Sequence, residues 1–334
     1  MRVECSLLNA FHKEPQRFDM TERLDTPRIG NVCLENRLIL APMAGMLRLS
    51  VRLAYRKLGA AMTCVGVIDA EAVVRAPDDG LINILGKREV TCEQERPVCV
   101  QLVGREAKTL ADAARSVQKH ASILNLNFSG PIQRLMDQGY GLSGLLRDPG
   151  RIRETVSAVV GSVDIPVTAK IRIGFEGPDV DVVRIAQICQ DAGASAIMVH
   201  ARFVRQMYRG PAHWEWIKRI KDHVDIPVVG NGAVGNPLDA KAMIDQTGCD
   251  FVMIGAAAFI HPLIFRQTNE VLETGRFRRA SDLRALLEFF RCYRDFTRTV
   301  ESRSLGSFLR RSCRNFLRVR AYMQRIQTGQ TTLE

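Results

Sequence analysis

Short apolar segments rich in valine and isoleucine alternate with amphipathic segments along most of the chain. Apolar runs of this length are typical of strands buried on both faces, and the amphipathic segments between them are typical of helices packed on a sheet. The pattern predicts eight strands, at residues 38–42, 62–69, 97–104, 123–128, 166–172, 195–200, 226–231 and 250–255.

Eight strand–helix units over roughly 230 residues predict a closed (β/α)8 TIM barrel of parallel strands. An open doubly wound sheet is the alternative, and the even spacing of the units disfavours it. After Pro262 the pattern becomes wholly helical, with helices expected over 282–300 and 304–327. We therefore expect a loose extension at 1–20, an α/β barrel at 21–265 and a C-terminal all-helical domain at 266–334.

Composition excludes several classes of protein. The 334 residues are 46% hydrophobic and 25% charged, which is ordinary for a soluble globular protein. No apolar run approaches the roughly 18–20 residues of a membrane span, and residues 1–20 lack the apolar core of a secretory signal. The 9 cysteines form no Cys-x-x-Cys pair, and the 6 histidines are dispersed. These features predict a cytoplasmic monomer with reduced thiols and no metal site.

Positive charge is concentrated in the helical part of the chain. The net charge is +11, and residues 261–334 contain 15 arginines, no lysine and 7 acidic residues. Guanidinium groups match phosphate oxygens, so this segment is expected to bind RNA or DNA, although a solvated helical surface or a membrane-surface helix has the same pattern. On a helical wheel one stripe collects Arg303, Arg310, Arg311, Arg314, Arg318 and Arg325.

Polar residues occur where the predicted strands end. In a TIM barrel the chemistry lies at this C-terminal face, and Lys170, His200 and Asn231 reach it from three different strands. The glycine-containing turns "GNGAV" and "IGAAA" follow the last two strands, where barrels commonly bind phosphate. That phosphate could belong to flavin mononucleotide (FMN) or to a sugar-phosphate substrate.

An ordered set of motifs resembles the tRNA-dihydrouridine synthases over residues 27–265. The set contains "LAPMAG" at 40–45, "RPVCVQL" at 96–102, "LLRDP" at 145–149, "IPVTAKIRIG" at 165–174, "VHAR" at 199–202, "QMYRGPAHW" at 206–214, "IPVVGNGAV" at 226–234 and "TGCDFVMIG" at 247–255.

The resemblance implies an enzyme that uses NADPH to reduce bound FMN and then reduces a uridine of tRNA to 5,6-dihydrouridine. It places Lys170 at the N1/O2 edge of the flavin and His200 against the flavin or the base. RNA contacts are implied for Arg172, Arg202, Arg205 and Tyr208. The implied FMN site consists of Pro42, Met43, Ala44, Gln101, Lys170, His200, Asn231, Gly232, Gly255 and Ala256.

The sequence departs from the family pattern at the catalytic acid. The family motif Asn-x-Gly-Cys-Pro is Asn127-Phe128-Ser129-Gly130-Pro131 here, so Gly130 stands where the acid cysteine is expected. The candidate catalytic residues are then Asn127, Ser129, Gly130, Lys170 and His200, and the substitute proton donors are Ser129, a water molecule or Tyr140.

Two further positions differ from the family. Ala256 replaces an arginine that holds the FMN phosphate, and Gly66 replaces a glutamate. Three interpretations remain open: a uridine reductase with a substitute acid, a flavoprotein with another acceptor, and a non-catalytic tRNA-binding module. A sugar-phosphate enzyme is a more remote fourth.

Overall fold

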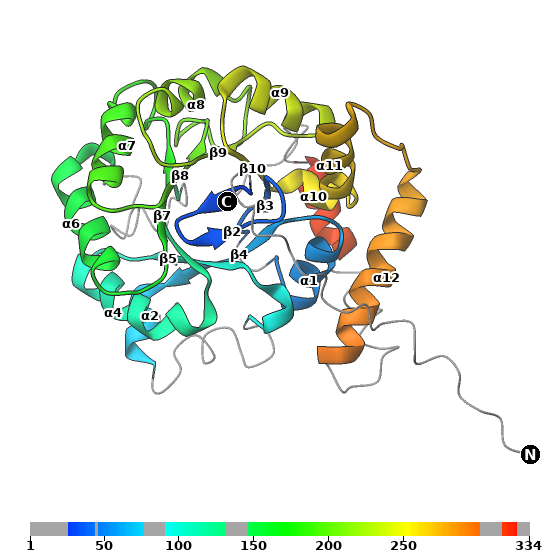
Figure 1. Ribbon diagram of the computed structural model, residues 1–334, viewed down its shortest axis with the longest axis horizontal. Coiled ribbons are helices and arrows are strands. Elements are labelled where there is room, and N and C mark those ends of the chain that lie inside the picture. Colours follow the sequence, from blue (N-terminus) through cyan, green and yellow to red (C-terminus); the bar gives the residue numbers. More distant parts are fainter. Residues whose placement is uncertain (1–25, 44–45, 77–90, 131–145, 301–315, 326–334) are drawn as a thin grey trace, which may run out of the picture.

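The structure is a computed structural model that describes residues 26–43, 46–76, 91–130, 146–300 and 316–325. Eight parallel strands close into a barrel in the order β10-β3-β4-β5-β6-β7-β8-β9 (Figure 1). This confirms the predicted TIM barrel. The strands are β3 (Leu38–Leu40), β4 (Met62–Asp69), β5 (Val98–Val103), β6 (Ile123–Phe128), β7 (Val167–Arg172), β8 (Ala196–His200), β9 (Val228–Asn231) and β10 (Phe251–Ile254).

Helices surround the barrel, and their ends follow ordinary capping chemistry. The Asn236 side chain accepts from the backbone amide of Asp239, whose carboxylate accepts from the Asn236 amide in return. The same helix ends at Gly248, which has a left-handed φ of 69°. The surrounding helices are α1 (Leu49–Lys57), α2 (Ala70–Arg75), α4 (Ala107–Val117), α6 (Pro149–Val160), α7 (Val182–Asp191), α8 (Trp214–Lys221), α9 (Pro237–Thr247), α10 (Ala256–Ile260) and α11 (Ile264–Thr274), with short 3-10 turns η2 (Glu93–Glu95) and η3 (Gln118–His120).

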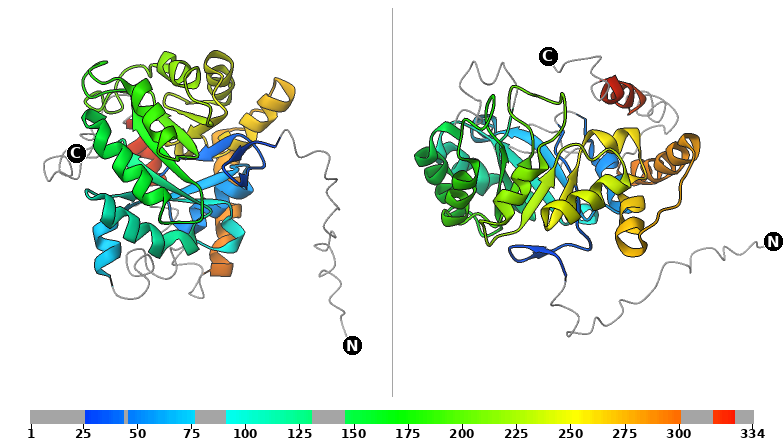
Figure 2. Two further views of the ribbon diagram at one scale, coloured as in Figure 1. Left: turned by 60° about the vertical axis from the view of Figure 1, so that its left-hand side comes forward. Right: turned by 90° about the horizontal axis from the view of Figure 1, so that it is seen from above.

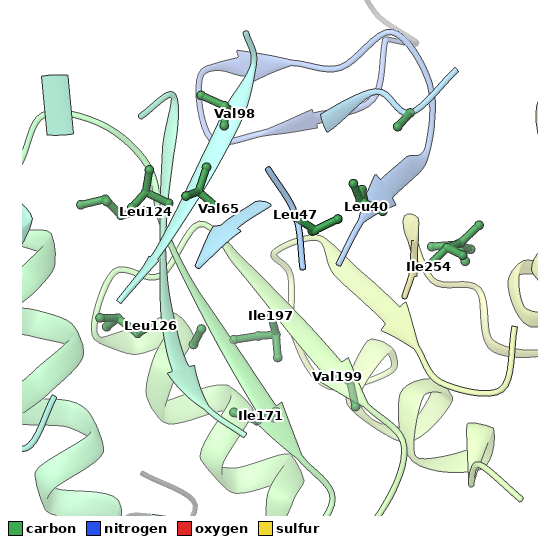
Figure 3. Close-up of a cluster of buried hydrophobic side chains, with 14 of the residues drawn as sticks. Leu40, Leu47, Val65, Val98, Leu124, Leu126, Ile171, Ile197, Val199 and Ile254 are labelled. Carbon is green, nitrogen blue, oxygen red and sulfur yellow. The ribbon is translucent and has the colours of Figure 1, made fainter. Parts of the chain in front are cut away.

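Alternate residues of each strand serve two different cores. Leu124 and Leu126 of β6, with Ile197 and Val199 of β8, belong to the large core between barrel and helices (Figure 3). Ile123 and the other residues that face the barrel axis form a second, smaller cluster. A parallel strand buried on both faces explains why each strand has an almost continuous apolar sequence.

A hairpin closes the end of the barrel at which the strands begin. Strands β1 (Arg28–Ile29) and β2 (Val32–Cys33) pair antiparallel. Ile29 and Leu34 are buried in the cluster along the barrel axis. The hairpin lies on the opposite side of the barrel from residues 316–325 (Figure 2), so the strands' C-terminal ends face those residues.

The C-terminal helical region shares the core of the barrel. Helix α12 (Asp282–Val300) has the predicted bounds, and residues 316–325 are helical. The rings of Phe289 and Phe316 stack with centroids 4.4 Å apart, and both residues belong to the barrel–helix core. Arg320 is buried and donates to Asp282 at 2.9 Å. The helical region is therefore packed on the barrel through a shared apolar core, and the ion pair joins the last helix to α12.

The predicted arginine stripe is only partly visible. Arg318 and Arg325 are exposed on the last helix, whereas Arg303, Arg310, Arg311 and Arg314 lie outside the described residues, as do Ala44 and Tyr140. No helix within the described ranges is long and apolar enough to cross a membrane.

Candidate active site

The site is built by residues that face the barrel axis at the C-terminal ends of the strands. Side chains two residues apart share a strand face, so each strand contributes a short inward-facing column. On β7 the column changes from Thr168 to Lys170 and Arg172, and on β8 from Ala196 and Met198 to His200. The axis is therefore apolar near the hairpin and polar at the opposite end, which we call the mouth.

Lys170 is buried at the mouth and donates to the Asn231 side-chain oxygen at 3.3 Å. The Asn231 amide nitrogen donates in turn to the Met253 carbonyl at 2.8 Å, which fixes the orientation of the amide. Burial, together with the charge of Arg172, lowers the pKa of Lys170 to about 7. The ammonium has three N–H groups, so it retains donors for a bound anion.

His200 is also buried, and it is surrounded by positive charge. Burial, and then the charges of Arg172, Lys170 and Arg202, hold the pKa of His200 well below its ordinary value. The imidazole is therefore neutral at physiological pH and offers one donor and one acceptor nitrogen. A site with these cations and a neutral histidine favours a ligand that carries negative charge.

Arg172 lies inside the protein, although the sequence predicts that it contacts RNA. Its side chain is 1% exposed, and its guanidinium donates to the carbonyls of Ser129, Phe203 and Met207. Burial lowers its pKa to about 10, so it remains charged at neutral pH. In this structure the guanidinium is occupied by the protein's own backbone.

The segment at the predicted acid position has a defined geometry. The Asn127 side-chain oxygen accepts from the Ser129 amide at 2.9 Å and from the Ser129 hydroxyl at 2.8 Å. Among the described residues, the nearest neighbour of a Cβ added at Gly130 would be the Asn127 amide nitrogen, 3.8 Å away. The Ser129 proton is thus engaged by Asn127, whereas Gly130 leaves room for a side chain.

The turn after β9 requires glycine. Gly232 has a φ of +117°, and a Cβ there would lie 3.2 Å from His200 Cδ2. The Gly232 carbonyl accepts from Trp214 Nε1 at 2.9 Å, which fixes the turn beside the histidine. After β10, Gly255 precedes Ala256 at the start of α10. Gly232 is buried and Gly255 is partly buried, and both lie in turns beside the mouth.

Gln101 reaches the mouth from β5, and the structure adds a partner that the sequence analysis missed. Gln101 donates to Asn125 at 2.7 Å, and Asn125 donates to the Thr168 hydroxyl at 2.8 Å. Asn125 precedes Asn127 by two residues, so their shared strand face was the signal that could have identified it. Pro42 and Met43 follow β3 and are partly buried.

The remaining predicted RNA contacts lie on the loop after β8. Arg202 is partly buried and donates to the Gly210 carbonyl at 3.0 Å, while its Nε is buried without a hydrogen-bond partner. Arg205 is exposed and pairs with Glu176 at 2.8 Å. The Tyr208 ring lies 5.9 Å from the His200 ring. The loop therefore places cationic and aromatic side chains beside the mouth.

Local backbone conformation accounts for the glycine that replaces glutamate at position 66. Gly66 has a φ of +142°, and a Cβ there would lie 2.9 Å from the Gln101 carbonyl oxygen. The pairing of β4 with β5 shifts register between Val65 and Ile68. A side chain at position 66 is therefore strained in this backbone. Within the described ranges, no group of three or more His, Cys, Asp or Glu residues is arranged to hold a metal ion.

Comparison with protein families gives one extended match. The family model described as "Dihydrouridine synthase (Dus)" matches residues 39–330. Similar curated proteins include "tRNA-dihydrouridine synthase B" of Pseudomonas aeruginosa, 37% identical over 77% of this chain and 76% of that protein. The protein of that name from Escherichia coli strain K12 is 36% identical over 74% and 76%. A "Probable tRNA-dihydrouridine synthase" of Rickettsia bellii is 33% identical over 78% and 79%.

Solved structures confirm the type of fold. Histamine dehydrogenase from Rhizobium sp. 4-9 matches with a TM-score of 0.56 at 15% identity, over 75% of this chain and 48% of that one. A 6-hydroxypseudooxynicotine amine oxidase of Pseudomonas geniculata N1 matches with a TM-score of 0.58 at 16% identity, over 75% and 49%. At these identities the likeness concerns the barrel alone.

The depressed pKa of Lys170 predicts a pH-dependent cost of burying this side chain. Between the folded pKa of about 7 and the ordinary value of 10.5, the unfolded chain binds more protons than the folded one. The contribution of Lys170 to the free energy of unfolding therefore rises with pH across this window, by at most about 1–2 kcal/mol per pH unit. Replacement by methionine should stabilise the ligand-free protein most below pH 7, with the gain shrinking toward pH 10.

Chemical denaturation of wild type and Lys170→Met at pH 6, 8 and 9.5 measures this difference. Lys218→Met on the exposed side of α8 is the matched control, and its difference from wild type should vary little with pH. A Lys170→Met difference that does not change with pH would contradict the burial of a charged ammonium.

Proposed function

The chain belongs to the dihydrouridine synthase family, and on that premise we propose that it binds FMN at the mouth. We further propose that it reduces a uridine of tRNA to 5,6-dihydrouridine, with NADPH as the reductant. The observation that carries the proposal is the buried Lys170 ammonium, held by Asn231 beside a neutral His200. These groups match the polar edge of an isoalloxazine ring, which becomes negatively charged on reduction.

The residues at the mouth fit FMN in two respects. Lys170 has N–H groups to spare for an anionic ring edge, and Gln101 projects from β5 onto the same inner layer of the barrel. We assign the phosphate to the turns at Gly232 and Gly255, and the turn at Gly232 has no room for a side chain, because a Cβ there would press against His200. Ala256 supplies no charge, so backbone groups would have to carry more of the phosphate interaction.

Bound FMN supplies, when reduced, the hydride that uracil needs at C6. Two of the protein's own residues then have defined tasks. Lys170 holds the negative charge at the ring edge, and its pKa rises when an anion binds beside it. Neutral His200 offers a hydrogen bond to the flavin or to the base without adding a positive charge. The reaction also requires a proton at uracil C5.

The proton donor is the point at which this chain differs from the family motif. The Ser129 hydroxyl donates to Asn127 and would have to break that bond before it could serve as an acid. A hydroxyl is also a far weaker acid than a thiol. Gly130 contributes no side chain that could act as an acid, so we propose that water delivers the proton, at a slower rate than a cysteine would.

RNA binding is assigned to two sets of groups. Arg202, Arg205 and Tyr208 lie beside the mouth, where a uridine taken out of its stack must enter. The arginine stripe of the last helix, which includes exposed Arg318 and Arg325, would bind phosphates at a greater distance. Because the helix at 316–325 packs into the barrel core, Arg318 and Arg325 keep a fixed spacing from the groups beside the mouth.

Flavin binding tests the proposal first. The purified protein should show a visible flavin absorption band, and mass spectrometry of the released cofactor should identify FMN. Ala256→Arg should tighten FMN binding by roughly 10–100-fold, the effect of one charged hydrogen bond, and leave riboflavin binding unchanged. Failure to bind flavin even after reconstitution would exclude the redox function and favour a tRNA-binding module.

Replacing Gly130 by cysteine should raise the rate of dihydrouridine formation in tRNA. A general acid contributes about 10²–10⁴-fold, and the structure has room for the side chain. Gly130→Ala is the matched control, because it adds the same Cβ without the thiol. Equal rates for the cysteine and alanine variants, with FMN bound in both, would show that the acid position does not limit the reaction.

Reversing Arg310, Arg314 and Arg318 to glutamate should weaken tRNA binding and reduce its salt dependence. Three lost phosphate contacts should lower the slope of log K against log salt by about 2. The matched control reverses Lys108, Lys218 and Lys241 on outer helices of the barrel, which changes the net charge equally. Similar losses in the two triple variants would indicate a general effect of charge.

A further inference from the structure

Arg172 connects two loops that are far apart in the sequence. Its Nε donates to the Ser129 carbonyl at 3.0 Å, while its Nη1 donates to the carbonyls of Phe203 at 2.9 Å and Met207 at 3.1 Å. Ser129 follows β6, whereas Phe203 and Met207 follow β8. The planar guanidinium presents its N–H groups in a fixed fork, so it sets the position of one loop relative to the other.

The loop after β8 contains a backbone conformation that needs support. Met207 has a φ of 56°, in the left-handed region that residues other than glycine, asparagine and aspartate rarely adopt. Its amide donates to the Val204 carbonyl at 3.1 Å, and its own carbonyl is one of the acceptors of Arg172. Arg172 therefore contacts the strained residue directly and favours its native conformation.

The turn at Met207 determines where Tyr208 lies. The Tyr208 ring is 5.9 Å from His200 and 5.8 Å from the Arg172 guanidinium carbon. On the other loop, the Ser129 amide and hydroxyl both bind Asn127, while its carbonyl binds Arg172. One side chain thus fixes both the aromatic residue beside the mouth and the segment that contains Gly130.

We infer that Arg172 is a positioning residue that joins the Asn127–Gly130 segment to the Phe203–Tyr208 loop and holds the left-handed turn at Met207. This inference deepens the proposed function, because the joined loops are those assigned to proton delivery and RNA entry. It differs from the role of RNA ligand that the sequence suggests. A side chain that is 1% exposed, with Nε and Nη1 on three backbone carbonyls, is not presented to a phosphate.

Arg172→Lys tests the inference, because lysine keeps the charge but cannot span three carbonyls in two loops. Amide hydrogen exchange of peptides covering 127–130 and 203–210, measured without RNA or flavin, should become about tenfold faster. If RNA binding and uridine reduction occur, kcat/KM should fall by up to about 100-fold, because misplaced groups slow the reaction. The salt slope of tRNA binding should not change.

Second substitutions at Met207 in the Arg172→Lys background separate positioning from other roles. Glycine adopts the left-handed conformation freely, so Met207→Gly should restore much of the slow exchange in residues 203–210. Met207→Ala is the matched control and should restore none, because alanine is as strained there as methionine. Should Arg172→Lys fail to fold, Met207→Gly with Arg172 intact should leave the loop's exchange slow.

Three results would overturn the inference. Unchanged exchange in Arg172→Lys with a salt slope reduced by about 1 would make Arg172 an RNA ligand. Equal recovery with glycine and alanine at 207 would show that the turn does not depend on Arg172. Fast amide exchange in the loop of Met207→Gly, with Arg172 intact, would also show that Arg172 does not hold the turn. Since exchange is measured without RNA or flavin, the inference can fail or succeed independently of the proposed activity.

Discussion

The burial of the Lys170 ammonium is the constraint on which the rest of the mouth depends. Charge this deep in a protein is tolerated only with compensating partners, and Lys170 has the neutral oxygen of Asn231 where a carboxylate would neutralise it. The nearby positive charge of Arg172 adds to this cost, and burial together with that charge keeps His200 neutral. The arrangement is stable because the barrel fixes these strand ends from every side, and it leaves a strong preference for a negatively charged occupant.

Much of the scaffold is predictable from the sequence because its signals are local. Strands β4 and β6 and helix α12 have the predicted bounds, since each is a long periodic segment bounded by turn residues. The alternation of strand faces is by itself enough to place Lys170, His200 and Asn231 on the inner face of the barrel, at the ends of their strands. The sequence does not show which distant residues a side chain will contact, and Arg172 is the main example. The family resemblance implies an RNA contact for Arg172, whereas the carbonyls that it binds belong to loops 31 to 43 residues away.

In the helical region, too, the sequence predicts which residues share a helix face but not which of them contact another helix. Arginines at helical spacing predict a solvent-facing stripe, and Arg318 and Arg325 are exposed. Arg320 lies between them in the sequence, but its side chain is buried and donates a hydrogen bond to Asp282 of the preceding helix. Nor could the pattern reveal that Gly66 is confined by the Gln101 backbone, because a strand residue with a positive φ has no sequence signal apart from glycine itself.

The hairpin of β1 and β2 has a consequence for the order of events. It covers one end of the barrel, and the cluster that includes Ile29 and Leu34 fills the axis with apolar side chains. For the described residues, access to the polar layer is then from the opposite end. In the proposed reaction a dinucleotide and a large RNA must share that single entrance, so each excludes the other. The kinetics should be of the ping-pong type, with the spent dinucleotide leaving before the RNA enters and an excess of either substrate inhibiting the other.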